Sequence, residues 1–348
     1  RAPPGSNLRE MYRHRQPPIG QPRARSARWL VHAAAAVLAL LAAGGAGAQD
    51  AVRGRVGIVV PLTPGSTSDQ VARLLADGIG HAVAQPVLVL NRPGASGRLA
   101  ATAFKDAPAD GTALMLAPMA VTVLNPMLYR RLGYDPAADF APIAQVARFR
   151  IALAVGPEVP AASLAEFVAW ARRQPVPAPC GNPGAGGLPH LFGLLLARAS
   201  GVDLTHLPYN GGVQAAADLT GGRLACTLDA MSTLIGWHRS GRLRILAVSG
   251  TERAAELPEV PTFAEQGFPA LDGLSWIGLY APAATPRPLI ERLARAVDDA
   301  LRSSAVRQGY AQLGLLAGAA TPEGLAAITR HDAMRWAPVV AAAGLSLD

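Results

Sequence analysis

Apolar runs that read as strands alternate with amphipathic segments that read as helices along most of this chain. The first run, residues 56–60, leads into a short loop of Pro, Gly and hydroxyl residues, and a helical pattern follows with Val71, Leu75 and Ile79 on one face. The same order of strand, loop and helix recurs further on. This alternation is typical of parallel sheets covered by helices and predicts an α/β fold.

The pattern places each predicted element between recognisable turn and cap residues. Strands are predicted over residues 56–60, 86–90, 114–117, 151–155, 178–181, 204–207, 224–228, 244–248 and 274–279. Helices are predicted after the loops at 63–69, 91–97 and 209–212, and over residues 125–129, 163–174, 189–200, 286–303 and from Pro322 onward. Pro338 is expected to end or kink the last helix.

The first loop is the most informative one. Thr67 precedes Gln70 by three residues, which is the spacing of a capping box, so a helix is expected to begin there. The first amides of such a helix lack acceptors within the helix and carry the positive end of its dipole. This corner is therefore expected to hold an anionic group.

The N-terminal segment carries most of the net positive charge of the chain. Residues 1–48 read as a leader with a secretory signal peptide: arginines precede an apolar run from Trp29 to Ala43, and Ala46-Gly47-Ala48 is a small-residue cleavage site before Gln49. The leader holds seven Arg and one Glu, so the remainder has 25 basic and 23 acidic residues, a net charge of +2 instead of +8. A periplasmic location is expected, and a nucleic-acid partner is not.

The two cysteines, Cys180 and Cys226, both fall in predicted strands. In an exported protein such a pair favours a disulfide, with two buried free thiols as the alternative. No metal-ligand spacing is found among the histidines, no phosphate-loop or G-x-S-x-G motif is present, and no cofactor is expected. The chain therefore does not read as an enzyme.

Short motifs in a fixed order resemble the Bug family, also called TctC-like, of extracytoplasmic solute receptors for tripartite tricarboxylate transporters. Each motif is weak alone, but together they extend over residues 56–345. They are Val60-Pro61 with Pro64-Gly65 and Asp69, residues 85–87, 91–95 and 107–111, Asn125-Pro126, Leu128-Tyr129, 134–136, 139–142, 189–191, Thr205-His206, Pro208-Tyr209, Gly221-Gly222, Leu257-Pro258 and 260–262.

The resemblance implies a two-domain periplasmic binding protein fold of type II-like topology, in which each domain is a mostly parallel sheet flanked by helices and a cleft lies between the domains. Domain 1 is expected to comprise residues 49–150 and 270–348, and domain 2 residues 151–269. The implied function is capture of a small carboxylated metabolite by hinge closure, with a membrane permease as a transient partner. We expect a monomer.

By position, the resemblance implies that the ligand is held mainly by main-chain amides and hydroxyls. The implied ligand-binding residues are Thr63, Gly65, Ser66, Thr67, Ala185, Gly186, Gly187, Asn210 and Asp229. Asp69 is interpreted as a brace for the first loop and His190 as a locally bonded helix residue. The chain departs from the family pattern at Ser66, where the family often has Gly, and it lacks the hydroxyls that the family often or usually carries at Pro118-Met119-Ala120 and at Ala185-Gly186-Gly187. Because lost hydroxyls remove hydrogen bonds, we expect a ligand with a less polar distal end than citrate.

Two other functions are considered for the same residues. In the first, the closed receptor docks on a sensor kinase instead of a permease. The sequence does not distinguish these two partners. A hydrolase would need a triad such as Ser66, His190 and Asp229, but nothing in their spacing favours one.

Overall fold

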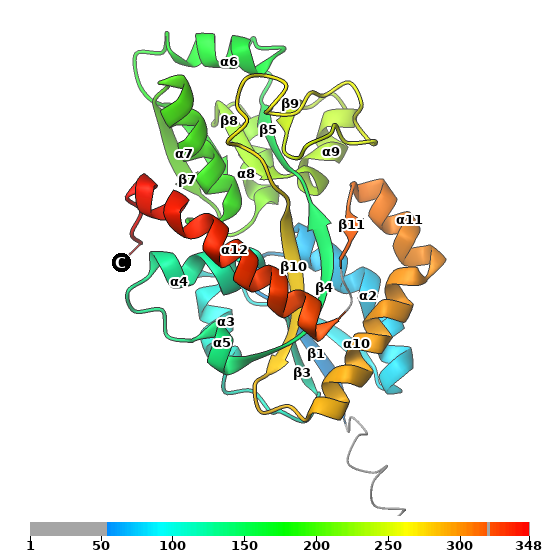
Figure 1. Ribbon diagram of the computed structural model, residues 1–348. Coiled ribbons are helices and arrows are strands. Elements are labelled where there is room, and N and C mark those ends of the chain that lie inside the picture. Colours follow the sequence, from blue (N-terminus) through cyan, green and yellow to red (C-terminus); the bar gives the residue numbers. More distant parts are fainter. Residues whose placement is uncertain (1–53, 319–320, 348) are drawn as a thin grey trace, which may run out of the picture. The chain divides into compact units, whose positions relative to one another are not determined.

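The computed structural model describes residues 54–318 and 321–347. The leader, the signal peptide and the cleavage site near Ala48 lie outside the described residues. Within the described part, two sheets and their helices alternate along the chain (Figure 1). We call the six-stranded sheet with its helices lobe A, and the five-stranded sheet with its helices lobe B.

Lobe A has the strand order β11-β4-β10-β3-β1-β2. Its strands are β1 (Val56–Val60), β2 (Val87–Asn91), β3 (Ala113–Pro118), β4 (Phe140–Phe149), β10 (Ser275–Pro282) and β11 (Leu316–Ala317). Its helical segments are α2 (Thr67–Val83), η1 (Ala95–Gly97), α3 (Arg98–Phe104), η2 (Ala120–Leu124), α4 (Asn125–Leu128), α5 (Pro136–Asp139), α10 (Arg287–Arg302), α11 (Ser304–Leu313) and α12 (Pro322–Ala343).

Lobe B has the strand order β7-β6-β8-β5-β9. Its strands are β5 (Ile151–Val155), β6 (Ala178–Asn182), β7 (Leu204–Pro208), β8 (Cys226–Ala230) and β9 (Arg244–Val248). Its helices are α6 (Leu164–Ala171), α7 (Leu188–Ser200), α8 (Gly212–Thr220) and α9 (Met231–Arg239). The strands of the two sheets fall on either side of the boundaries near residues 150 and 270, and the division into domains stays a prediction.

Both sheets are mixed, whereas mostly parallel sheets were predicted. The strands β1, β2 and β3 pair in parallel, as do β6, β7 and β8. The strands that pass between the lobes run against them: β10 is antiparallel to β3 and β4, and β5 is antiparallel to β8 and β9. Only Arg150 separates β4 from β5, so one nearly continuous strand joins the lobes (Figure 1).

The predicted strands are confirmed, although β8 begins two residues later than expected. The prediction omitted β4, α9 and α11, and the short elements α5 and β11. The burial of β4 does not alternate and the strand contains Pro142, which argues against a strand on sequence alone. Of the two outcomes expected at Pro338, an end of the helix is wrong, because α12 continues through Pro338 to Ala343, and the kink stays a prediction. The carbonyl of the exposed residue Met334 loses its helical donor there, and water can replace that donor.

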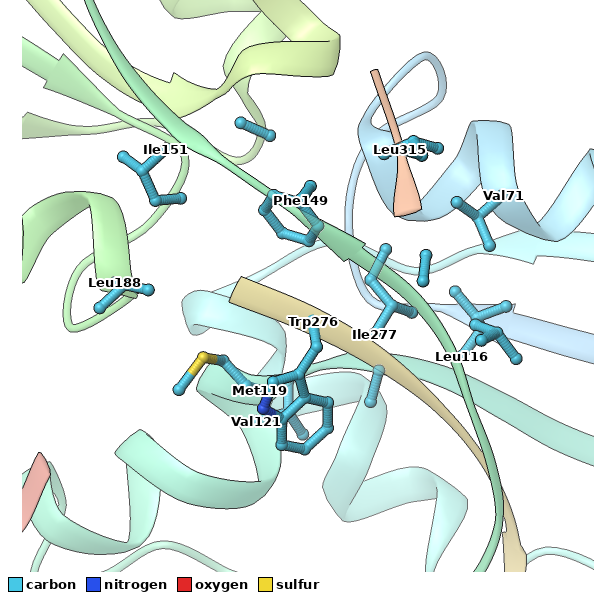
Figure 2. Close-up of a cluster of buried hydrophobic side chains, with 14 of the residues drawn as sticks. Val71, Leu116, Met119, Val121, Phe149, Ile151, Leu188, Trp276, Ile277 and Leu315 are labelled. Atoms are coloured by element: carbon cyan, nitrogen blue, oxygen red, sulfur yellow. The ribbon is translucent and has the colours of Figure 1, made fainter. Parts of the chain in front are cut away.

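A single buried apolar cluster runs from lobe A into lobe B along the joined strand. Figure 2 shows Phe149 and Ile151 on this strand, with Trp276 and Ile277 of β10 beside it and Leu188 of α7 on the lobe B side. The Trp276 indole N–H donates to Asp332 Oδ2 of α12 at 2.7 Å, which satisfies the only polar atom of that buried side chain. The cluster fixes the strand that positions both lobes. Across the described ranges, no helix has both the length and the apolar character needed to cross a bilayer.

Candidate functional site

A cavity of about 70 Å³ lies between the two lobes. Lobe A contributes the start of α2, the ends of β3 and β4, and the start of β10, while lobe B contributes the loop before α7, the start of α8 and the end of β8. The lining residues are Leu62, Ser66, Thr67, Ser68, Ser96, Pro118, Ala120, Phe149 and Ser275 from lobe A, and Pro183, Gly184, Ala185, Gly187, Pro189, Gly212, Asp229, Ala230 and Thr233 from lobe B. None of these lining residues is Lys, Arg or His, so a bound anion would be held by neutral groups.

The start of α2 faces this cavity. Ser66 is the N-cap residue, and its Oγ accepts a hydrogen bond from the Asp69 N–H at 3.3 Å. The N–H groups of Thr67 and Ser68 have no acceptor among the described residues. Thr67 and Ser68 are nonetheless buried, so these two donors are available to a ligand in the cavity.

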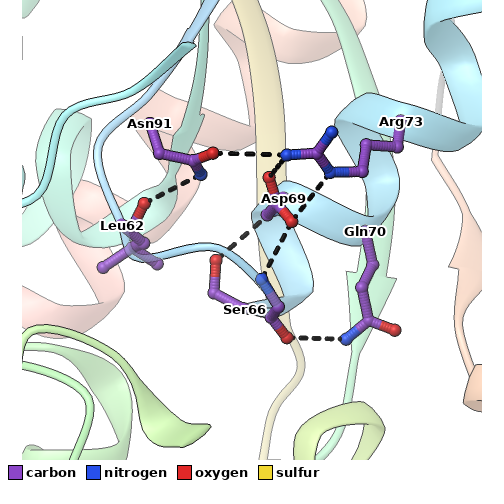
Figure 3. A network of polar contacts seen from close by, with 7 residues as sticks. Leu62, Ser66, Asp69, Gln70, Arg73 and Asn91 are labelled. Atoms are coloured by element: carbon purple, nitrogen blue, oxygen red, sulfur yellow. Dashed lines mark hydrogen bonds and ion pairs between the residues drawn. The ribbon is translucent and has the colours of Figure 1, made fainter. Parts of the chain in front are cut away.

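Asp69 braces the loop that precedes α2 (Figure 3). Its Oδ2 accepts the Gly65 N–H at 2.9 Å, and both its oxygens accept from Arg73, which also reaches the amide oxygen of Asn91. Burial raises the pKa of the Asp69 carboxyl, but the hydrogen bonds from Arg73 and Gly65 outweigh it and hold the pKa below its usual value. The interpretation of Asp69 as a brace is confirmed.

Four hydrogen bonds between described residues join the lobes around the cavity. Thr67 Oγ1 lies 2.6 Å from Ser232 Oγ of α9, and 3.2 Å from Thr233 Oγ1. Ser96 Oγ donates to the Ala185 carbonyl at 2.8 Å, and the Thr63 N–H donates to the Asn210 carbonyl at 3.3 Å. The structure is therefore a closed arrangement of the two lobes.

The backbone at Ser96 is held in an unfavourable conformation. Ala95 and Ser96 have positive φ values of 47° and 54°, in a region that costs residues with a Cβ about 1–2 kcal/mol each. Asn125 holds the Ser96 carbonyl through its side-chain amide at 3.3 Å. The strained turn thus places the Ser96 hydroxyl against the glycine-rich loop of lobe B.

His190 supports the glycine-rich loop from within lobe B. Its Nδ1 accepts the Gly186 N–H at 2.9 Å, and its ring lies edge-on to His206 with centroids 4.8 Å apart. Burial, with a smaller contribution from His206, lowers the pKa of His190 to about 4. The ring is therefore neutral at physiological pH and available as an acceptor, in agreement with the predicted local bond.

Asp229 brings the one carboxyl group to the cavity lining. It is the residue before the last of β8, its Oδ1 accepts the Ala230 N–H at 2.6 Å, and its Oδ2 is buried without a hydrogen-bond partner among the described residues. Burial raises the pKa of Asp229 to about 7.

The predicted ligand residues separate into two groups. Ser66, Thr67, Ala185, Gly187 and Asp229 line the cavity. The other four, Thr63, Gly65, Gly186 and Asn210, do not line it and instead hold its loops through main-chain hydrogen bonds.

The predicted capping box is wrong in its register. Ser66 rather than Thr67 caps α2, because the Thr67 hydroxyl is taken up by the contacts with α9. The Gln70 side chain bonds the Gly65 carbonyl at 2.9 Å instead of reaching back to a cap amide.

Several lining residues were missed from the sequence. Phe149 and Ser275 sit at the ends of the strands that cross between the lobes, and Thr233 lies in the first turn of the unpredicted helix α9. Ser96 and Ser68 had a signal in the sequence, because both belong to loops singled out for their Gly and hydroxyl content.

Cys180 and Cys226 form a disulfide between the adjacent parallel strands β6 and β8, where they are direct register partners. The alternative of two free thiols is therefore not what the structure shows. The bond ties together β6, the strand before the glycine-rich loop, and β8, the strand that contains Asp229.

Two α/β lobes, joined by crossing strands and enclosing a small cavity with unpartnered helix N–H groups, define a solute-binding protein of the periplasmic binding protein class. The family model described as the tripartite tricarboxylate transporter family receptor matches residues 71–345, and the chain belongs to this family. The predicted family and fold class are thereby confirmed.

Individual relatives and solved structures are similar to this chain over most of its length. Protein BugT of Bordetella pertussis is 32% identical over 294 residues, which cover 83% of this chain and 89% of BugT. A solved structure described as R. palustris Rpa4515 with adipate has a TM-score of 0.81 and 32% identity, covering 84% of this chain and 98% of that one. MatC (Rpa3494) from Rhodopseudomonas palustris with bound malate has a TM-score of 0.78 and 31% identity, covering 82% and 99%.

Proposed function

We propose that this receptor captures a small carboxylated metabolite outside the cytoplasm, without altering it, and presents it to the permease of a tripartite tricarboxylate-type transporter. Family membership supports the receptor role and the class of transporter. The related proteins bound to adipate and to malate support a carboxylate as the ligand.

The observation that carries the proposal is the pair of unpartnered N–H groups at Thr67 and Ser68. They lie at the N-terminus of a 17-residue helix, where the dipole favours an anion. The cavity that they face has hydroxyl groups but no cationic side chain among its lining residues. One carboxylate accepting both N–H groups would complete the hydrogen bonding of this helix end.

The remaining walls indicate the rest of the ligand. Leu62, Pro118, Phe149, Pro183 and Pro189 supply apolar surface, and the cavity is small. The hydroxyl donors among the lining residues are few, so a third carboxylate, as in citrate, would lie against apolar surface without a donor, at a cost of about 1–3 kcal/mol for the unpaired group. We therefore propose a ligand whose distal end is less polar than that of citrate.

Capture proceeds by closure of the lobes. A ligand that touches both α2 of lobe A and the loop before α7 of lobe B binds the closed form better than an open one, and shifts the population toward it. The hydrogen bonds of Thr67 and Ser96 across the cavity form only in the closed form. The permease then recognises the closed surface of a monomeric receptor; a sensor kinase that recognises the same surface is the alternative output.

The hydrolase alternative lacks the hydrogen bonds that it needs. Ser66 Oγ and Asp229 Oδ1 each accept from a main-chain N–H within their own segment, and His190 Nδ1 accepts from Gly186. Among the described residues, no hydrogen bond links these three side chains into a relay.

The test uses protein exported from the full chain and purified from the periplasm of an expression host. Calorimetric titrations with adipate, malate, benzoate and citrate are expected to show saturable 1:1 binding, with citrate weakest, and NMR is expected to show unchanged ligand after prolonged incubation. Tightest binding to citrate would contradict the proposed ligand class. Turnover of ester or amide substrates that Ser66→Ala abolishes would contradict the receptor role itself.

A further inference from the structure

Asp229 is the titratable side chain that lines the cavity, and its environment is unusual for a carboxylate. The residue is 4% exposed, and only its Oδ1 has a hydrogen-bond donor. Its Oδ2 occupies the space next to Gly212 where a side chain would otherwise begin, since a Cβ on Gly212 would lie 1.3 Å from this oxygen. The fold therefore makes room for a carboxyl group that it does not neutralise.

No charged group of the packed elements faces Asp229. Its neighbours on β8 are α7, α8, α9, β5 and β6. The titratable side chains of these elements point elsewhere or are neutral: His190 accepts from Gly186, Arg198 donates to Ala342, Asp218 pairs with Arg223, His238 contacts Glu259, Arg239 donates to Gln312, and Cys180 is in the disulfide. Across the cavity, Asp69 is paired with Arg73.

An ionised Asp229 in this position would be a buried charge with no cationic partner among the packed elements, which is a costly way to bury a carboxyl group. A ligand carboxylate at the start of α2 would share the same small cavity, and like charges at such short range strongly disfavour double ionisation. Burial alone already brings the pKa of Asp229 to about 7. A ligand carboxylate raises the pKa further, so the neutral acid is the form that suits the closed complex.

Resting on the function proposed above, we propose that Asp229 is protonated when a carboxylate is bound and donates a hydrogen bond from Oδ2 to an anionic oxygen of the ligand. The proton comes from solvent, so each capture event takes up one proton. The group acts as a specificity residue: it favours anionic acceptors and disfavours ligands that present an amine at this end.

Calorimetry with adipate between pH 6 and pH 9 tests the proposal on the unmodified protein. Titrations at each pH in phosphate and in Tris, which differ in ionisation enthalpy, give the number of protons exchanged on binding. We expect uptake to approach one proton above pH 7, and Kd to rise about tenfold per pH unit there. Malate replaces adipate as the probe if adipate does not saturate.

Two variants test whether Asp229 is the group that takes up the proton. Asp229→Asn keeps a donor at every pH, so its affinity is expected to become independent of pH and its proton uptake to vanish. Asp298→Asn removes a carboxylate of α10 that pairs with Arg302, and it is expected to keep the full pH dependence.

The outcomes separate this inference from the proposed function. Binding with no proton uptake and a flat Kd, or affinity that increases with pH, would overturn the role of Asp229 and leave the receptor function intact. No saturable binding to any carboxylate of the panel at pH 6 would overturn both. The proton count does not depend on a variant, so it decides the matter even if Asp229→Asn fails to fold.

Discussion

Ser66 has two roles at the start of α2. Its hydroxyl satisfies the Asp69 N–H and so stabilises the helix, and by occupying the cap position it leaves the Thr67 and Ser68 N–H groups directed at the cavity. Removing the cap therefore changes both the free energy of unfolding and the geometry of the anion site.

Ser163 offers a matched comparison, because it caps α6 through the same kind of bond to Glu166 but does not line the cavity. Ser66→Ala and Ser163→Ala are each expected to lower the free energy of unfolding by about 1 kcal/mol. Only Ser66→Ala is expected to weaken adipate binding, by roughly tenfold. Urea unfolding and calorimetry measure the two effects, and equal affinities in both variants would contradict the placement of the anion.

His190 predicts a dependence of stability on acid pH. Its pKa is about 4 in the fold and near 6.5 when unfolded, so between these values the unfolded chain binds a proton that the folded chain does not. The free energy of unfolding therefore falls as the pH falls from 6.5 to 4, by roughly 2–3 kcal/mol from this group.

His190→Gln is expected to remove this contribution, whereas replacing the exposed residue His81 by Gln is expected to keep it. Denaturant unfolding at a series of pH values checks both variants. An unchanged slope in His190→Gln would show that another group titrates in this range.

The role of a single residue could be predicted from the sequence where it depends on a neighbour close in the chain. A carboxylate in the first turn of a helix indicated the brace at Asp69. The position of His190 near the start of a predicted helix likewise indicated a local hydrogen bond. The residues Phe149, Thr233 and Ser275 could not be predicted, because they reach the cavity only through the pairing of β4 with β10 and through α9. No local pattern marks such long-range contacts.

At the scale of elements, the βα units of each lobe were predictable because their strands are apolar runs followed by capped helices. The crossing strands were harder: β4 is ten residues long, is buried at most positions and contains a proline. The antiparallel pairing of β10 with β3 and β4 makes the sheet of lobe A mixed, and that of β5 with β8 and β9 makes the sheet of lobe B mixed. The pairing of Cys180 with Cys226 depended on two strands being neighbours, which the order of elements alone did not determine.

The disulfide ties β6 to β8 across 46 residues. In the chain-entropy model a loop of this length is worth about 4 kcal/mol, with 2–4 kcal/mol typical of measured cases. The double variant Cys180→Ala with Cys226→Ala is expected to lose stability by this amount while its adipate affinity changes little, because neither cysteine lines the cavity. Thermal unfolding with and without reductant, followed by calorimetry, checks both points.

At the scale of the whole receptor, closure requires close packing between the lobes. Gly186 of lobe B packs against Leu128 of α4 and Leu347, and a Cβ there would lie 2.3 Å from Leu128 Cδ1. Gly201, at the end of α7, has a similar positive φ but open space around it. Substitutions at these two glycines therefore distinguish an effect on lobe closure from the free-energy cost of a positive φ.

Gly186→Ala and Gly201→Ala are each expected to cost about 1–2 kcal/mol of folding stability for the positive φ. Gly186→Ala is also expected to weaken adipate binding tenfold or more, because the added methyl group holds the lobes apart. Small-angle scattering with saturating adipate should show compaction for Gly201→Ala and less for Gly186→Ala. Equal compaction and affinity would contradict closure at this contact.

The central claim is that main-chain N–H groups at the start of α2 hold a carboxylate in the cavity between the lobes. A crystal structure of the receptor with adipate tests it most directly. The account predicts carboxylate oxygens within about 3 Å of the Thr67 and Ser68 nitrogens, with no Lys or Arg side chain in contact. A carboxylate bound to a cationic side chain, or outside this cavity, would contradict the account.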